Sequence, residues 1–427
     1  MMFMLAEKNG CLYIDGCKIE NLANKYGTPL YIYSKEAIDE RISELKNGLY
    51  KKYNKFRAAY AAKAFFPKEM ARIINQAGLC IDVVSAGELY TAMAVDFPAE
   101  RIEFNGNNKL RSELEMAIEY GVGRIIIDGL DEIRQIEEIC QEKGKKTKVL
   151  IRLTPGVPTS THDYIITGKK DSKFGLELDE QILLSAIEKI LKSGNIELYG
   201  FHFHIGSQLF DVEPYLDSLE EVLKMVGRIY DKVNYIPKEI NVGGGFGVQY
   251  TDEERKPYSY FLEPIIERIV DFYQKKSWEN PNIVIEPGRS IVGEAGITVY
   301  KTGDIKDIKG VRKYVSVDGG MTDNIRPALY QAEYKACLVK NSENRDKEKV
   351  TICGKCCESG DVIIKDIELP KIKSGDLIAV LTTGAYGYSM ASNYNKLPIP
   401  AVVMTEREKE KLIVKRQSFE DICSNEL

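Results

Sequence analysis

The chain has 427 residues, 44% of them hydrophobic and 29% charged, so it exceeds the about 250–300 residues that one hydrophobic core usually serves. Its formal net charge of −5 excludes a global basic field that would attract nucleic acid or an anionic membrane surface. The length therefore predicts two domains. No stretch reaches the roughly 18 uninterrupted apolar residues that span a bilayer, so we expect no membrane segment.

The N-terminal segment predicts strands rather than a targeting sequence. Residues 1–10 (MMFMLAEKNG) lack the basic and the long apolar regions of a signal peptide, which favours a soluble cytoplasmic protein. Residues 11–19 (CLYIDGCKI) and 29–34 (PLYIYS) have strand patterns, and a helix is predicted over residues 36–49. We therefore expect residues 1–35 to join the β-domain formed by the C-terminal part of the chain.

Residues 36–288 are predicted to form an α/β fold, a (β/α)8 TIM-like barrel. Eight short β-rich runs recur, and amphipathic patterns such as residues 112–120 and 131–140 separate them. A doubly wound open sheet would also alternate in this way, but eight units over 233 residues match a barrel of about 250 residues. The predicted strands are residues 56–63, 80–85, 102–106, 124–129, 148–154, 198–205, 239–244 and 282–288.

Residues 289–427 predict a β-domain, because strand-like pieces alternate with Gly, Pro and Lys turns and helical windows are few. The nine cysteines have no regular spacing, which fits a reducing compartment rather than a disulfide framework. Cys353 and Cys356 form a CxxC, but no second CxxC or histidine pair accompanies them, so we predict no metal site. The strand-like pieces are residues 313–320, 349–355, 361–370, 376–387 and 411–417.

The first predicted barrel strand closes on Lys63, within the motif YAAKA. Functional groups of such barrels lie where strands end, at the C-terminal face. Small apolar neighbours would desolvate the amine and favour its neutral form, which can attack an aldehyde to form a Schiff base. An ordinary strand-end lysine that reaches solvent is the alternative, and it is favoured if the motif is taken alone.

The sixth strand ends in FHFHIGSQ, where period-two geometry directs His202 and His204 toward the barrel interior. His204, nearer the rim, can stack on a flat cofactor ring, whereas a structural core role is preferred for His202.

After the seventh strand a glycine run lets backbone N–H groups approach a phosphate closely, although tight turns also use glycine. The predicted phosphate-binding residues are Gly243, Gly244 and Gly245, with a hydroxyl from Ser207.

The eighth strand ends in Glu286 and, after Pro-Gly, Arg289. A carboxylate that accepts the N–H of a pyridine ring keeps the ring protonated and makes it a stronger electron sink. Arg289 would bind an anionic group through two hydrogen bonds, while a structural Glu–Arg ion pair is the alternative. Together, the lysine, stacking ring, glycine nest and acid are the contacts that pyridoxal 5'-phosphate needs.

Over nearly its whole length the chain resembles the barrel-type (fold type III) pyridoxal-phosphate decarboxylases, most of all the diaminopimelate decarboxylase family. The resemblance implies a carboxy-lyase that converts meso-2,6-diaminopimelate to L-lysine and carbon dioxide, the last step of lysine biosynthesis. The motifs that carry it are YGTPLYIY, YAAKA, DVVSAGEL, GNNK, THDYIITG with the following KFG, FHFHIGSQ, GGGFG, EPGRSIV, DGGMTDNIRPALY, CESGD and GAYGYSMASNYN.

The resemblance also implies roles for individual residues. Lys63 would carry the cofactor, His204 would stack on it and Glu286 would pair with the pyridine nitrogen. The phosphate would be held by Ser207, Gly243, Gly244, Gly245 and Tyr386.

On the substrate side, the resemblance implies that Cys357 protonates the carbanion, in trans, because the CESGD loop of the family reaches the neighbouring subunit's site. An obligate homodimer follows. A substrate without the distal carboxylate would leave buried arginines unpaired, so lysine and ornithine should be poor substrates. The implied substrate-binding residues are Arg289, Arg326, Tyr330, Glu358 and Tyr386.

Departures from the family pattern concern the distal pocket. Lys355 and Cys356 precede the acid where Gly-Pro-x-Cys-Glu is usual, Thr322 replaces an Asn, and QAEYK, with Tyr334, replaces GAYH. The alternatives are a decarboxylase of ornithine, lysine, arginine or carboxynorspermidine, a non-catalytic pyridoxal-binding regulatory homologue, and a phosphate-binding barrel isomerase or hydrolase without pyridoxal. The non-catalytic regulatory homologue is disfavoured because the expected catalytic residues are all present.

Overall fold

The computed structural model describes residues 4–47, 52–156, 172–340 and 345–427. These form two compact units: a barrel unit of Ser43–Gly247 and Arg255–Gly288, and a β unit of the residues up to Ile42, Val248–Glu254 and Arg289–Leu427. The predicted barrel began at residue 36, whereas residues 36–42 group with the β unit in this division. The functional domain boundaries predicted from the sequence stay a prediction. The THDYIITG motif, residues 161–168, lies outside the described residues.

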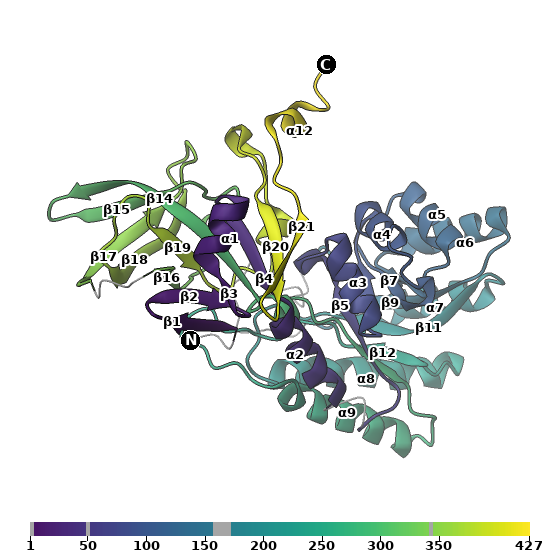
Figure 1. The fold of residues 1–427 in the computed structure, drawn as a ribbon. Helices are drawn as coiled ribbons and strands as arrows, with labels where there is room; N and C mark the ends of the chain where they lie inside the picture. Colours follow the sequence, from purple (N-terminus) through teal and green to yellow (C-terminus); the bar gives the residue numbers. More distant parts are fainter. Residues whose placement is uncertain (1–3, 48–51, 157–171, 341–344) are drawn as a thin grey trace. The chain divides into compact units, whose positions relative to one another are not determined.

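The barrel unit contains a closed ring of parallel strands, which confirms the predicted fold (Figure 1). Each of the eight predicted runs forms one strand, and a further short strand, β10 (Leu176–Glu177), pairs beside the fifth. The ring closes because the last strand pairs with the first and the fourth pairs with the fifth. In ring order the strands are β5 (Phe56–Ala61), β6 (Cys80–Val83), β7 (Ile102–Phe104), β8 (Arg124–Ile127), β9 (Thr147–Thr154), β11 (Ile196–Phe203), β12 (Glu239–Asn241) and β13 (Asn282–Ile285).

Helices connect consecutive barrel strands, and local sequence signals set their ends. The Ser85 side chain accepts the Glu88 N–H at the start of one helix, and two others end at Gly121 and Gly144, whose left-handed φ of 82° and 61° suits glycine. Among the described residues no helix is long and apolar enough to cross a bilayer. The helices are α3 (Lys68–Gln76), α4 (Ala86–Met93), α5 (Arg111–Tyr120), α6 (Leu130–Lys143), α7 (Glu180–Lys192), α8 (Glu213–Val233) and α9 (Tyr258–Lys275).

A mostly antiparallel sheet dominates the β unit. The predicted strand at residues 29–34 lies in its middle as β4, between β14 and β20, so this N-terminal strand joins the C-terminal sheet. In sheet order the strands are β18 (Val362–Pro370), β17 (Lys347–Cys353), β15 (Arg312–Val317), β14 (Gly296–Ile308), β4 (Leu30–Ser34), β20 (Ala401–Glu406) and β21 (Lys409–Val414), with β16 (Ala336–Leu338) and β19 (Leu377–Val380) paired alongside β14.

The first strands of the chain form a small sheet of their own: β1 (Leu5–Lys8), β2 (Cys11–Ile14) and β3 (Cys17–Lys18). Their apolar side chains pack into the same core cluster as β4, β14 and β20, so they belong to the β unit through packing. Among the described residues, one isolated bridge, between Cys11 and Lys340, pairs them with the rest of the β unit. The remaining helices are α1 (Ile19–Tyr26), α2 (Lys35–Leu45), α10 (Arg289–Val292), α11 (Arg326–Tyr330) and α12 (Phe419–Cys423).

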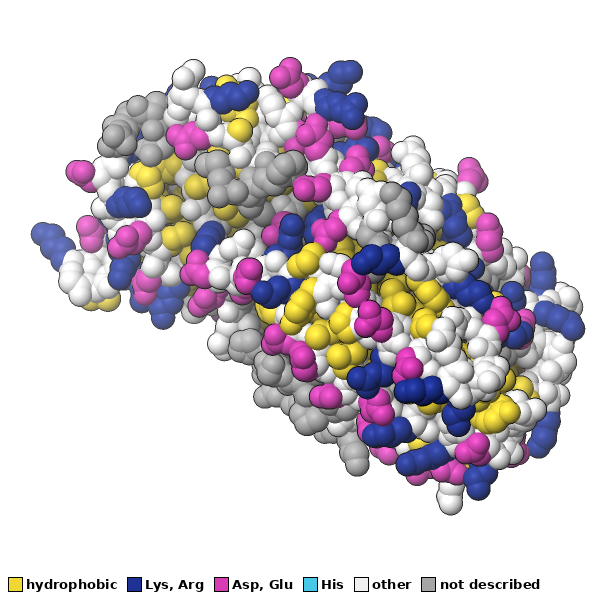
Figure 2. Space-filling view, turned by 90° about the horizontal axis from the view of Figure 1, so that it is seen from below, with side chains coloured by type: hydrophobic (Ala, Val, Ile, Leu, Met, Phe, Trp, Pro, Cys, Tyr) yellow, Lys and Arg dark blue, Asp and Glu magenta, His cyan; other side chains and the backbone are white. Residues whose placement is uncertain are grey.

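The surface carries both signs of charge. On the face drawn in Figure 2, Lys and Arg side chains alternate with Asp and Glu and do not gather into one basic field. This mixture agrees with the small formal net charge of −5. Any strong anion site must therefore be built locally.

Candidate active site

Lys63 lies at the C-terminal end of β5, in a short 3-10 helix spanning Ala62–Ala64. Its neighbours Ala62 and Ala64 are buried, but the lysine side chain is exposed. The expectation that small neighbours desolvate the amine is therefore not met within the chain. The fold instead fixes the backbone and leaves the amine accessible to a small molecule.

His204 follows β11 at the same end of the barrel and is half-buried. Its Nδ1 accepts the backbone N–H of Gly244 at 3.3 Å, which leaves Nε2 to carry the proton of a neutral ring. Burial, then the nearby charges of Lys63 and Arg152, hold the pKa of His204 well below its usual range. A neutral, fixed imidazole is suited to stacking on a flat ring.

The glycine run after β12 has no room for side chains. A Cβ on Gly243, Gly244 or Gly245 would lie 2.6, 2.1 or 2.3 Å from a backbone carbonyl oxygen of a neighbouring segment. Gly243 and Gly245 also have positive φ angles of 72° and 109°, which favour glycine. Gly243 donates its N–H to Asn241 Oδ1 at 2.9 Å and Gly244 donates to His204 Nδ1 at 3.3 Å, so among the described residues the Gly245 N–H is the amide of the run that is open to an anion. Ser207 is half-buried just after His204.

Glu286 follows β13 and is buried, and its contacts converge on one oxygen. Oε1 accepts from Asn241 Nδ2 at 2.9 Å and Asn105 Nδ2 at 3.4 Å, and it lies 3.0 Å from His202 Nε2. Within the described part of the chain, Oε2 takes part in no hydrogen bond or ion pair. Burial alone would raise the pKa of Glu286, but His202, then His204 and Lys63, lower it to about 2. Glu286 therefore stays ionised and can accept a further N–H.

Three more acids lie buried in the barrel interior, on β6, β7 and β12. Burial, then the charge of Glu286, raises the pKa of Asp82 well above its usual value, and burial, then Glu239, does the same for Glu103. Arg124 binds Glu239 with two hydrogen bonds of 3.0 and 3.1 Å. The raised pKa values of Asp82 and Glu103 favour their neutral forms, which lessens the negative charge around Glu286.

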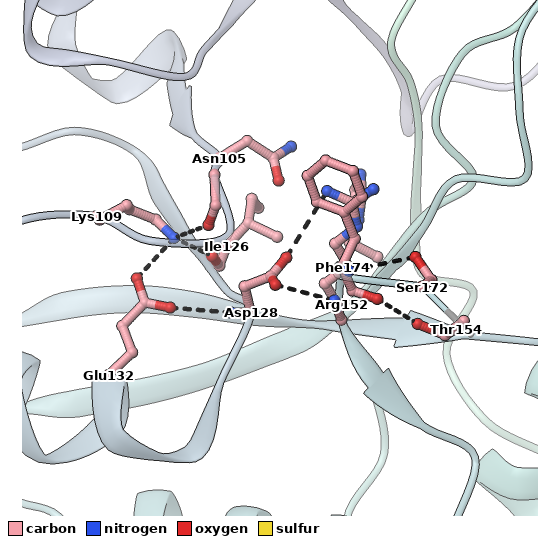
Figure 3. A network of polar contacts seen from close by, with 12 residues as sticks. Asn105, Lys109, Ile126, Asp128, Glu132, Arg152, Thr154, Ser172 and Phe174 are labelled. Atoms are coloured by element: carbon pink, nitrogen blue, oxygen red, sulfur yellow. Dashed lines mark hydrogen bonds and ion pairs between the residues drawn. The ribbon is translucent and has the colours of Figure 1, made fainter. Parts of the chain in front are cut away.

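A second polar network fixes the ends of β7, β8 and β9 (Figure 3). The buried Lys109, in the GNNK motif, lies 2.6 Å from Glu132 and donates to the carbonyls of Gly106 and Ile126 at 2.8 Å each. Asp128, 3.7 Å from Arg152, accepts the backbone N–H of Gly175 at 2.9 Å. These contacts give the GNNK motif a structural role that the sequence did not reveal.

In the β unit two predicted arginines, Arg289 and Arg326, are buried among tyrosines. Arg289 donates to the Tyr250 hydroxyl at 2.6 Å and lies 4.8 Å from the Tyr386 ring. Arg326 donates to the Tyr334 hydroxyl, and its guanidinium lies 4.8 Å from the Tyr250 ring. Sequence reasoning missed Tyr250 and noted Tyr334 only as a departure from the family pattern. Arg326 has no carboxylate partner among the residues described.

The remaining predicted residues of the β unit are more open. Cys357 and Glu358 are exposed, and Tyr330 is half-buried at the end of α11. The Cys357 N–H donates to Asn395 Oδ1 at 2.7 Å. All nine cysteines are free, and in the described ranges no cluster of His, Cys, Asp and Glu could hold a metal ion.

Comparison with known families agrees with this fold and site. Residues 36–293 match the family described as "Pyridoxal-dependent decarboxylase, pyridoxal binding domain". The matched segment covers more than half of the 427 residues and contains the lysine, histidine, glycine run and acid described above. These features define a barrel-type pyridoxal-dependent decarboxylase.

The relatives narrow the class. The chain is 48% identical to the diaminopimelate decarboxylase of Bacillus subtilis, over 98% of this chain and 96% of that protein. It superposes with a TM-score of 0.94 on the crystal structure of diaminopimelate decarboxylase from M. jannaschii, at 36% identity and over 100% and 98% of the two chains. A lysine/ornithine decarboxylase from Vibrio vulnificus, at 23% identity over 91% and 97% of the chains and a TM-score of 0.77, shares the fold. The chain belongs to the diaminopimelate decarboxylase family.

Proposed function

We propose that the chain catalyses the decarboxylation of meso-2,6-diaminopimelate to L-lysine and carbon dioxide with pyridoxal 5'-phosphate as cofactor. The observation that carries this proposal is Glu286, a buried carboxylate held ionised beside a neutral His204 and an accessible Lys63. Such an acid is needed where a pyridine ring must stay protonated. The M. jannaschii relative was crystallised in complex with L-lysine, which supports the proposed product.

The chain's own residues fit the cofactor. Among the described residues, the N–H of Gly245 is the amide of the glycine run that stays open to a phosphate, and Oε2 of Glu286 can accept a pyridine N–H. Lys63 supplies the amine that binds the aldehyde, and His204 supplies the stacking face. When bound, the pyridoxal ring accepts the electron pair released as the carboxylate leaves as carbon dioxide.

The β unit supplies the substrate contacts in this proposal. Arg289 and Arg326 bind carboxylate oxygens of the end that does not react, while Tyr330 and Tyr386 line that site. Glu358 binds the distal ammonium. Cys357 then gives its proton to the carbon that lost carbon dioxide, which completes L-lysine. Orientation by these groups decides which of the two amino-acid ends reacts.

We further propose that the working unit is a cytoplasmic homodimer. Cys357 and Glu358 lie on an exposed loop and are therefore available to act on a neighbouring subunit's site. Nine free cysteines support a reducing compartment.

The test compares substrates on the purified enzyme with added cofactor. We expect carbon dioxide release from meso-diaminopimelate and little from ornithine, lysine, arginine or carboxynorspermidine. A higher kcat/KM for one of the other four would assign the protein to a different substrate. The visible absorbance of the protein gives an independent reading, since a barrel without pyridoxal would be colourless.

A further inference from the structure

We propose that Asn241 is a positioning residue that ties the ring-binding acid to the phosphate-binding loop. This inference rests on the proposed function, because it assigns Glu286 to the ring nitrogen and the glycine run to the phosphate. Asn241 touches neither group itself. It is the last residue of β12, two positions before Gly243, and it is fully buried.

The amide of Asn241 makes three hydrogen bonds to three different segments. Its Nδ2 donates to Glu286 Oε1 and to Glu103 Oε2, both at 2.9 Å. Its Oδ1 accepts the backbone N–H of Gly243 at 2.9 Å. One rigid amide therefore fixes the orientation of the acid and the start of the glycine loop at the same time.

The chemistry of the site requires an amide here. Two carboxyl groups need a donor, and a backbone N–H needs an acceptor, and among side chains of this length only asparagine offers both without charge. A donor on Oε1 turns Oε2 of Glu286 away from the network, toward the position where a ring N–H can bind. A misplaced carboxylate would lose that bond, and a shift of Gly243 would displace the Gly245 N–H that the proposal gives to the phosphate.

Asn105 provides a matched comparison. It also donates to Glu286 Oε1, at 3.4 Å, and to Asp82 at 3.1 Å, but within the described part of the chain none of its hydrogen bonds reaches the glycine loop. Loss of Asn105 should therefore affect the acid alone. Loss of Asn241 should affect the acid and the loop together.

The experiment measures the affinity of the apoprotein for pyridoxal phosphate and for pyridoxal, which lacks the phosphate, by spectrophotometric titration. The ratio of the two affinities reports the phosphate loop. We expect Asn241→Leu to lower this ratio about tenfold, the effect of one lost hydrogen bond to a charged ligand. Asn105→Leu should keep the ratio within about twofold of wild type. Asn241→Asp should keep it as well, because its carboxyl oxygen still accepts the Gly243 N–H.

A second titration reports the acid. It uses 1-deazapyridoxal phosphate, in which the ring nitrogen is replaced by carbon, so the wild type should bind it more weakly than pyridoxal phosphate. Asn241→Leu and Asn105→Leu should both narrow this difference. If Asn241→Leu does not fold, Asn241→Ala replaces it, because water can fill the space that the smaller side chain leaves. The expected affinity ratios in both titrations are the same.

Two kinds of failure can be told apart. An unchanged phosphate ratio in Asn241→Leu or Asn241→Ala would refute the link to the loop, whether both affinities stay at the wild-type values or fall equally, as a general structural role predicts. A wild type that binds neither compound would overturn the proposed function and, with it, this inference.

Discussion

The two units differ in the charge of the polar groups that they bury. In the barrel unit, a group of buried acids surrounds Glu286, and two asparagines, His202 and Arg124 contact these acids. In the β unit, Arg326 is a buried cation whose described partners are one tyrosine hydroxyl and tyrosine rings. Hydroxyls orient a guanidinium without neutralising it.

The difference indicates which kind of ligand each unit suits. The barrel unit keeps the Glu286 carboxylate charged, and among the described residues its Oε2 makes no hydrogen bond, so the unit suits a cation such as a protonated pyridine N–H. The β unit holds its positive charge in a fixed direction, so it suits a carboxylate. If the barrel unit binds the cofactor and the β unit selects the substrate, as proposed, substitutions should disturb the two functions separately.

The strongest disturbance of the barrel side is Lys63→Ala. Without the amine that binds the aldehyde, we expect carbon dioxide release to fall by about 10³-fold or more. Borohydride treatment with cofactor should label the Lys63 peptide of the wild type and leave the variant unlabelled. Lys68→Ala, an exposed lysine at the start of α3, is the matched control and should behave as wild type. A wild type labelled on another peptide would refute the assigned role.

Cys357→Ala tests the open loop of the β unit. We expect turnover to slow by about 10²-fold, the contribution of a general acid, while the cofactor absorbance stays unchanged. Cys423→Ala, also exposed, should have no effect.

Mixing the inactive Lys63→Ala and Cys357→Ala proteins tests whether the loop acts in trans. In a random mixture about half of the dimers pair the two variants, and each has one intact site, so about a quarter of the wild-type activity should return. No recovery after subunit exchange, with mixed dimers detected by mass, would exclude a shared site.

Arg326→Met tests the substrate side while leaving cofactor binding alone. Loss of the partner of a buried substrate carboxylate should lower kcat/KM for meso-diaminopimelate by about 30-fold or more. The affinity for pyridoxal phosphate should not change, since Arg326 is not among the residues proposed to hold the cofactor. Arg312→Met, which removes a partly exposed ion pair with Asp366, is the control. A variant that loses cofactor and substrate affinity equally would contradict the separation of the two functions.

The barrel could be predicted from the sequence because buried parallel strands appear as short apolar runs separated by amphipathic helices. All eight runs form strands, although most strands end two or three residues earlier than the runs do. The sequence could point to Lys63, His204 and Glu286 because each follows a predicted barrel strand, where functional groups of such barrels lie, and each stands in a recognisable motif. Whether they act as proposed remains a prediction.

The supporting residues could not be predicted, because their partners are distant in the chain. Asn241 contacts an acid 45 residues away, and Asn105 reaches the same acid from 181 residues away. Tyr334 looked like a departure until the fold placed its hydroxyl on Arg326. The pairing of β1 to β3 with one another also depended on backbone register, which apolar patterns alone do not specify.

The smallest expected effect concerns Asp15, a half-buried acid of the β unit whose pKa shift is opposite to that of Glu286. Burial raises the pKa of Asp15 to about 6, although Ser34 and Thr405 donate to it at 2.7 and 2.8 Å. The unfolded chain therefore releases this proton first, and the free energy of unfolding should fall as the pH rises from about 4 to 6. Because the carboxyl is partly exposed, we expect a change on the order of 1 kcal/mol.

Asp15→Asn should remove this part of the pH dependence, because the amide does not titrate. Thermal unfolding at pH values on either side of that window should show a smaller difference in Tm for the variant than for the wild type. Asp307→Asn, an exposed aspartate on β14 of the same unit, should keep the wild-type difference. The opposite sign, with stability rising through this window because of Asp15, would mean that its two hydroxyl donors outweigh burial, as His202, His204 and Lys63 together do for Glu286 in the barrel unit.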